Sequence, residues 1–141
     1  MKEIKILNTQ ENMTPVLQNI LKAVEDDTTL VFENAEYHFY KDGTYVDYFA
    51  PSNNYASVKN VVFTLFNKKN ITVQGNGARL VFHGRIFPFI LQGCDNLTMR
   101  DFSIDFAFPR VYQAEVLESN EEYLEFYMDK QNIRIVYRTD I

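Results

Sequence analysis

Two short stretches decide the fold, Asn70-Ile71-Thr72-Val73 and Asn96-Leu97-Thr98-Met99. The second repeats the pattern of the first 26 residues further along the chain, and Phe89 repeats Phe63 at the same distance. A repeat of about 20 to 30 residues with several short strands is typical of one coil of a solenoid. We therefore expect strands of successive coils to stack in parallel about 4.8 Å apart, with the two asparagines in contact.

A change in alternation supports the repeat. In each copy the apolar residues occupy odd positions first and even positions later. The switch follows Gly75-Asn76-Gly77 in the first copy and lies near Asp101 in the second. Because side chains alternate across a strand, a switch at one place in both copies predicts a corner there. The alternative is chance similarity in a β-rich chain such as a sandwich.

Residues 13–25 predict an amphipathic helix ahead of the strands. Thr14 is a suitable N-cap and Pro15 suits the first helical turn, where its missing N–H costs nothing. Its apolar side chains, at helical spacing, are Leu17, Ile20, Leu21 and Val24. The open end of a solenoid exposes core and unpaired strand edges, so we expect this helix to cap it.

The fold class is thus mainly β: the start of a right-handed parallel β-helix, a pectate-lyase-like solenoid, with an N-terminal capping helix. Residues 112–117 and 123–128 alternate in polarity around a polar centre and predict a C-terminal β-hairpin. A further strand-like run follows at 133–137. We divide the chain into residues 1–110, the cap and first coils, and residues 111–141, the possible start of an inserted β-barrel module.

Composition excludes several classes of protein. The net charge is −5 with scattered basic residues, so we expect no nucleic-acid partner. No apolar run is long enough to span a membrane, and the N-terminal stretch has no signal-peptide pattern. The single cysteine, Cys94, gives no disulfide framework, and neither it nor the two histidines have metal-ligand spacing. We expect no metal site and no cofactor.

The stretch from Asn70 to Pro109, NITVQGNGARLVFHGRIFPFIL and then NLTMRDFSIDFAFP, resembles the N-terminal part of the α-1,3-galactosidases of glycoside hydrolase family 110. The motifs that support the resemblance are His83-Gly84-Arg85 and Ser103-Ile104-Asp105. Phe106 departs from the family, which usually has Trp there. The resemblance implies a β-helix enzyme that removes terminal α-galactose with inversion, acts on galactose-terminated glycans and is secreted or periplasmic.

The family's chains are several times longer, and its catalytic aspartates lie on later coils that nothing here matches. Inverting glycosidases use two carboxylates about 6.5–9.5 Å apart. Asp101 and Asp105 are too far apart along a straight strand, and the adjacent acids Glu121 and Glu122 point in different directions. Asp26 and Asp27 follow the helix and form no evident pair. We therefore assign no catalytic residue and expect the chain alone to be inactive.

His83, Arg85 and Asp105 are the candidate substrate-binding residues. Each also has a structural interpretation: the first two flank Gly84 in a turn, and Asp105 lies opposite Arg79 if the 26-residue offset holds. Tyrosines 37, 40, 45 and 48 could stack on sugar rings or pack in the interior. The alternative function is a non-enzymatic carbohydrate-binding module, or a structural module that self-associates through its open β-helix end.

Overall fold

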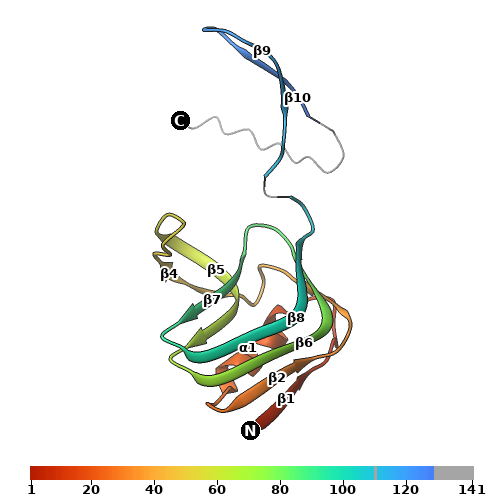
Figure 1. The fold of residues 1–141 in the computed structure, drawn as a ribbon, viewed down its shortest axis with the longest axis vertical. Helices are drawn as coiled ribbons and strands as arrows, with labels where there is room; N and C mark the ends of the chain where they lie inside the picture. Colours follow the sequence, from red (N-terminus) through yellow and green to blue (C-terminus); the bar gives the residue numbers. More distant parts are fainter. Residues whose placement is uncertain (110, 129–141) are drawn as a thin grey trace. The chain divides into compact units, whose positions relative to one another are not determined.

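The computed structural model describes residues 1–109 and 111–128, and it separates into two units that divide between Ala107 and Phe108. The first unit is a β-solenoid, which confirms the expected parallel β-helix (Figure 1). The strand-like run expected at 133–137 lies outside the described residues. Each unit is described separately below.

One long parallel sheet forms the main wall of the solenoid. Strand β6 (Lys69–Phe82) lies at its centre, with β8 (Asp95–Phe106) on one side. On the other side, β2 (Thr28–Phe32) and β3 (Glu36–Phe39) pair with the first and second halves of β6. Strand β1 (Lys2–Ile6) pairs in parallel with β2. Side chains that point inward from these strands form one buried core.

A second, smaller sheet faces the first. Strand β5 (Ser57–Phe66) pairs in parallel with β7 (Phe87–Gln92) and antiparallel with β4 (Tyr45–Phe49). Val61 and Val62 are both fully buried, so the alternation of β5 breaks there, and Figure 1 shows the strand bending. Because β4 includes Tyr48, the polar segment expected to be a loop from Tyr48 onward begins later.

Asparagine stacking holds one corner of the coils, as expected. The Asn96 amide donates to the side-chain oxygen of Asn70 at 2.8 Å, and the Asn70 amide donates to Asp27 at 2.7 Å. All three residues have positive φ, between 52° and 57°. Asn and Asp tolerate this left-handed conformation better than other residues with a side chain, so the corner requires these residue types.

The second corner also lies where the sequence predicted it, but it shifts the register. Lys69 pairs with Asp95, an offset of 26 residues, whereas Ala78 pairs with Phe102, an offset of 24. Three residues, Gly75-Asn76-Gly77, therefore lie opposite the single residue Asp101. A Cβ on Gly75 would overlap the carbonyl of Asp101 and the Cβ of Phe102, so this wide corner packs closely on the next coil only with glycine.

Helix α1 (Thr14–Ala23) takes the place of a strand beneath β5 in the first coil. The expected N-cap at Thr14 is wrong, because the cap position is Met13 and the Thr14 hydroxyl bonds the backbone of Tyr40 instead. The Gln18 side chain is 3% exposed, and its amide donates to the carbonyl of Val62 at 2.7 Å. A buried carbonyl on the edge of β5 is thus satisfied by the capping helix.

The second unit contains the expected hairpin. Strand β9 (Glu115–Ser119) pairs antiparallel with β10 (Leu124–Tyr127). The side-chain oxygen of Asn120 accepts hydrogen bonds from the backbone N–H groups of Glu122 and Tyr123, which closes the turn. All residues of both strands are exposed. A two-stranded hairpin is at best marginally stable in water, so these strands need a covering surface.

We predict that Gln18→Met lowers the free energy of unfolding by about 1–3 kcal/mol, because methionine keeps the shape of the side chain but leaves the Val62 carbonyl without its buried donor. Urea denaturation followed by circular dichroism measures this change. Gln10→Met, at an exposed position before the helix, is the matched control and should change stability little. Equal effects of the two substitutions would contradict a capping role for Gln18.

Candidate functional site

A row of polar side chains crosses the outer face of the main sheet. His38 and Glu36 come from β3, Arg79 from β6 and Asp105 from β8. His83 follows β6 directly. Because outward positions alternate with core positions on each strand, these side chains face solvent while their neighbours pack inside. We call them, together with Tyr40, the polar row.

An arginine links the two carboxylates of the polar row. Arg79 donates from one guanidinium nitrogen to Glu36 at 2.8 Å and from the other to Asp105 at 2.7 Å. The pairing expected between Arg79 and Asp105 is present, but the register is different: Arg79 lies opposite Ser103, and Asp105 lies opposite Val81. The long arginine side chain reaches diagonally across the strands, so the ion pair survives the register shift.

This arrangement keeps Asp105 ionised. The hydrogen bond from Arg79, followed by one from the backbone N–H of Phe106, lowers the pKa of Asp105. A catalytic general acid must hold a proton near neutral pH, which requires a raised pKa. Asp105 is therefore unsuited to protonate a leaving group, and its contacts are structural ones between neighbouring coils.

The two histidines lie together, although the sequence gave no reason to pair them. Nδ1 of His38 lies 2.8 Å from Nε2 of His83, and Nε2 of His38 lies 2.9 Å from a Glu36 carboxylate oxygen. The carboxylate places the proton of neutral His38 on Nε2, so Nδ1 accepts a hydrogen bond from His83. Tyr40 stacks on the other side of His83, with ring centroids 4.1 Å apart.

Arg85 does not join these groups. It follows Gly84, which has a φ of 77°, and its exposed side chain makes no hydrogen bond or ion pair with another described residue. The structure therefore brings His83 and Asp105 onto one sheet face and leaves Arg85 on the connecting turn. Within residues 1–109 and 111–128, no group of three or more histidine, cysteine or acidic side chains is arranged to hold a metal ion.

The four tyrosines separate into distinct environments. Tyr37 is fully buried and its hydroxyl donates to the carbonyl of Ile6 at 2.7 Å, so it is a core residue and cannot stack on a sugar. Tyr40 belongs to the polar row. Tyr45 and Tyr48 instead line a hollow of about 320 Å³ beside β4. We call this the aromatic hollow; its lining residues are Tyr45, Asp47, Tyr48, Phe49, Phe66, Asn67 and Gln92.

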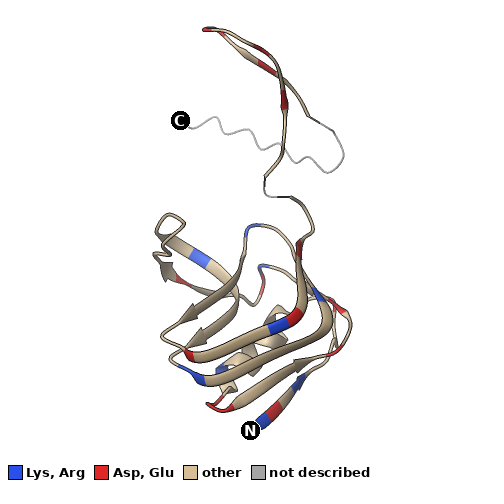
Figure 2. Cartoon of the chain, in the orientation of Figure 1, with Lys and Arg blue, Asp and Glu red and all other residues tan. Residues whose placement is uncertain are grey.

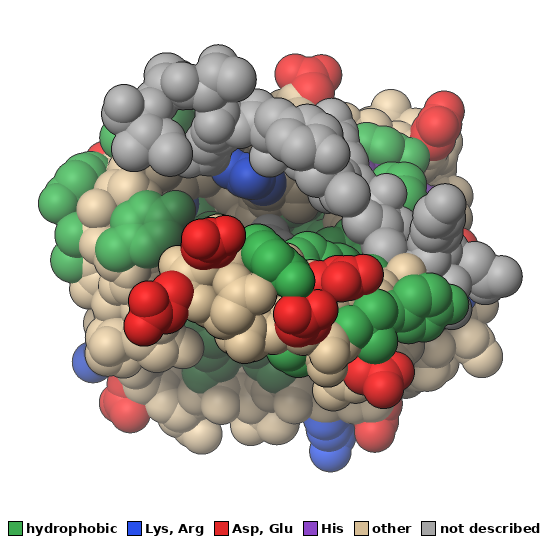
Figure 3. All heavy atoms as spheres, turned by 90° about the horizontal axis from the view of Figure 1, so that it is seen from above, with side chains coloured by type: hydrophobic (Ala, Val, Ile, Leu, Met, Phe, Trp, Pro, Cys, Tyr) green, Lys and Arg blue, Asp and Glu red, His purple; other side chains and the backbone are tan. Residues whose placement is uncertain are grey.

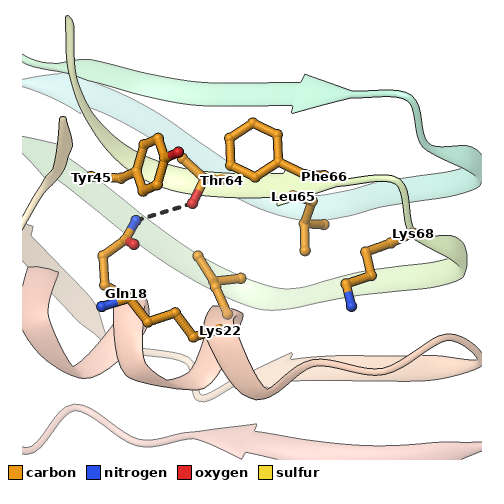
Figure 4. A pocket seen from close by; sticks show the side chains of 8 residues that line it. Gln18, Lys22, Tyr45, Thr64, Leu65, Phe66 and Lys68 are labelled. Atoms are coloured by element: carbon orange, nitrogen blue, oxygen red, sulfur yellow. Dashed lines mark hydrogen bonds between the residues drawn. The ribbon is translucent and has the colours of Figure 1, made fainter. Parts of the chain in front are cut away.

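A second pocket, of about 250 Å³, lies between α1 and β5 (Figure 4). Its walls include Leu21 and Leu65, and Lys22 and Lys68 supply ammonium groups. Gln18 and Thr64 are joined there by a hydrogen bond of 3.3 Å, visible as the dashed line. The lining contains no carboxylate, so the pocket has no acid or base for glycoside hydrolysis.

Charges of both signs are mixed over the solenoid, where acidic and basic residues lie on neighbouring strands (Figure 2). Strands β9 and β10 contain glutamates and no basic residue. Seen from above, red acidic side chains lie among green hydrophobic ones (Figure 3). No helix among the described residues is long and apolar enough to cross a membrane.

The histidine pair generates a prediction about stability. Burial, followed by the charge of neighbouring His38, lowers the pKa of His83 from its ordinary value of 6.5, while the charge of Glu11 opposes this. The unfolded chain then binds a proton more readily than the folded one, so stability is full above the ordinary value and falls as the pH decreases below it. We expect the melting temperature to fall between about pH 7 and about pH 5.

His83→Gln should flatten that part of the profile, as measured by thermal unfolding over the same range. Asp105→Asn is the control, because the lowered pKa of Asp105 affects stability only near and below its ordinary value of 3.8. Parallel slopes for the native chain and His83→Gln would show that His83 is not the group that titrates.

Comparisons with known proteins complete this description. No family model matches the chain. It is 40% identical over 126 residues to "Alpha-1,3-galactosidase B" of Phocaeicola vulgatus, an alignment covering 84% of this chain and 21% of that protein. The protein of the same name from Bacteroides thetaiotaomicron is 32% identical over 121 residues, covering 84% of this chain and 20% of its own length.

"Alpha-1,3-galactosidase A" of Shewanella woodyi is 30% identical over 122 residues, again covering 84% of this chain and 20% of the relative. The chain thus spans about a fifth of the length of these curated relatives, at their N-terminal end. The resemblance indicated by the His83-Gly84-Arg85 and Ser103-Ile104-Asp105 motifs is confirmed: the chain is homologous to the N-terminal part of the α-1,3-galactosidases.

Proposed function

We propose that this chain forms the N-terminal coils of a β-helix glycosidase that removes α-1,3-linked galactose with inversion, and that these 141 residues alone are inactive. The similarity to the N-terminal fifth of several α-1,3-galactosidases supports the first part. We further propose that the whole protein acts on galactose-terminated glycans and is secreted or periplasmic, as the family resemblance implies.

The arrangement of the polar row supports the second part. Glu36 and Asp105 are held by opposite nitrogens of one guanidinium group, so a pair of carboxylates lies close together on an exposed sheet face. Arg79 occupies the space between them, where a glycosidase would place the scissile bond. Both partners of the arginine are needed as anions, and neither is available to donate a proton. In this chain the coils act as scaffold, and the catalytic acids belong elsewhere in the whole protein.

A chimera tests the glycosidase assignment. We expect that replacing the N-terminal fifth of the Phocaeicola vulgatus relative with this chain retains hydrolysis of α-1,3-galactobiose, because the chain supplies equivalent coils, and that deleting this fifth abolishes it. Galactose release measures both. The native relative is the control, and a chimera that folds, by circular dichroism and sedimentation, but releases no galactose would contradict the assignment.

The chain alone should not hydrolyse p-nitrophenyl α-galactoside or α-1,3-galactobiose above the rate in buffer. Asp105→Asn is assayed in parallel, since Asp105 is the acid whose environment is best defined. Hydrolysis by the native chain would contradict the proposed absence of catalytic acids, and its loss in Asp105→Asn would locate the acid in the polar row.

The alternative is a non-enzymatic module that self-associates, and the sheet edges favour considering it. No described strand pairs with the outer edge of β8 or of β7. Leu97, Met99 and Phe102 on β8 are only partly buried against the core. Unpaired edges recruit further strands, either from the rest of a longer protein or from a second copy.

For the isolated chain we predict a dimer or larger assembly at micromolar concentration by sedimentation velocity. Thr98→Lys, exposed on the edge strand β8, should weaken assembly by opposing like charges across the new interface. Thr72→Lys is the matched control, because Thr72 lies directly opposite Thr98 but one strand further inside the sheet. A monomer at all concentrations would contradict self-association.

A further inference from the structure

We propose that the aromatic hollow beside β4 binds a neutral hexopyranose unit of a glycan. The choice of a sugar as ligand rests on the proposed function, whereas the location and the contacts rest on the structure. The hollow is separate from the polar row and from every residue singled out as substrate-binding in the sequence. Its volume of about 320 Å³ lies at the lower end of the range for small-molecule pockets.

The shape of the hollow follows from β4 and from the bend in β5. Tyr45, Asp47 and Phe49 alternate along β4 and so project to one face. The bend brings the end of β5 back toward that face, and the ring of Phe66 lies 5.3 Å from that of Tyr45. Phe49 and Phe66 are stacked nearly parallel, 6.3 Å apart. The hollow is therefore bounded by rings fixed by their mutual contacts.

Aromatic faces suit the apolar C–H face of a pyranose ring. Partly exposed rings offer a large, rigid contact area at little cost in conformational entropy, which is why tyrosine is favoured in binding surfaces. Tyr48 is 62% exposed and makes no ring contact with another described aromatic residue. A sugar that entered the hollow would cover apolar surface of this ring that is otherwise in water.

Polar groups are placed around the rings to bind hydroxyls. The carboxylate of Asp47 accepts hydrogen bonds from the Tyr45 hydroxyl at 3.2 Å and from the Tyr48 backbone N–H at 2.7 Å, so it is held in place. No described residue hydrogen-bonds the side-chain amides of Asn67 or Gln92. Each amide carries donors and an acceptor, which matches hydroxyl groups that both donate and accept.

The charge in the hollow selects a neutral sugar. Asp47 is its one charged lining residue, and an anionic sugar would be repelled by it. Burial, followed by the hydrogen bond to Asp47, raises the pKa of Tyr45, so the phenol stays protonated and serves as a donor. The neighbouring helix pocket, which shares Tyr45 and Phe66, has two lysines and aliphatic walls and lacks this set of neutral amides.

Titration of the 141-residue chain with α-1,3-galactobiose, followed by saturation-transfer NMR and calorimetry, tests the proposal. We expect saturable binding that Tyr48→Ala weakens about three- to tenfold, the range expected for loss of one aromatic contact. Gln92→Ala should weaken binding by a similar factor. Both residues are exposed, so the fold should persist, and thermal unfolding verifies this.

Tyr55→Ala is the matched control, because Tyr55 is 77% exposed but lies outside the hollow. It should leave binding unchanged. The anionic trisaccharide 3′-sialyllactose should bind more weakly than galactobiose, and equal or tighter binding would contradict the neutral specificity.

Three results would overturn the site: no binding of galactobiose, equal effects of Tyr48→Ala and Tyr55→Ala, or a Tyr48→Ala variant that loses self-association while keeping sugar affinity. The last would identify the hollow as a contact between copies of the chain. None of them would affect the glycosidase proposal, because hydrolysis by the chimera is a separate measurement.

Discussion

The pairing of β6 on both of its edges is the constraint on which the rest of the solenoid depends. The first and second halves of β6 pair with β2 and β3 on one side, and its whole length pairs with β8 on the other. Every coil must supply the backbone partners of the coil beneath it, because buried N–H and C=O groups are costly when unpaired. The asparagine corner, the glycine corner and the helix cap all serve this requirement. Gln18 shows this at a single residue, since its side chain replaces the strand that β5 lacks below Val62.

Much of this arrangement could be predicted because it is periodic. The offset of 26 residues correctly pairs Asn70 with Asn96 and Phe63 with Phe89. Two features broke the period. Gly75-Asn76-Gly77 lies opposite Asp101 alone, which reduces the offset to 24 over the rest of β8. The first coil has an offset of 43, because β4 and its loop are inserted between β3 and β5, and a comparison of copies at one fixed period cannot detect it.

The same two breaks explain which parts of the candidate site were foreseen. Arg79 and Asp105 were paired from the wrong register, and the ion pair forms only because an arginine side chain spans the diagonal. His38 and His83 belong to coils related by the offset of 43, so their contact had no counterpart in the 26-residue pattern. Tyr37 and Tyr45 look alike in sequence, yet one donates to a core carbonyl and the other to a surface carboxylate. Such differences depend on the sheet that each strand joins, which local sequence does not specify.

A regular coil offers little for ligand binding, and this determines where a site can form. Outward side chains on a continuous parallel sheet stack into flat rows, and the polar row is already saturated by its own ion pairs and hydrogen bonds. A concave surface requires an interruption of the period. In the first coil the insertion adds 17 residues to the later offset, the difference between 43 and 26, and its strand β4 folds against β5. The bend in β5 then brings Phe66 over the exposed face of β4. Rings and free amides converge at the place where the repeat fails, because only there does the chain leave the plane of the sheet.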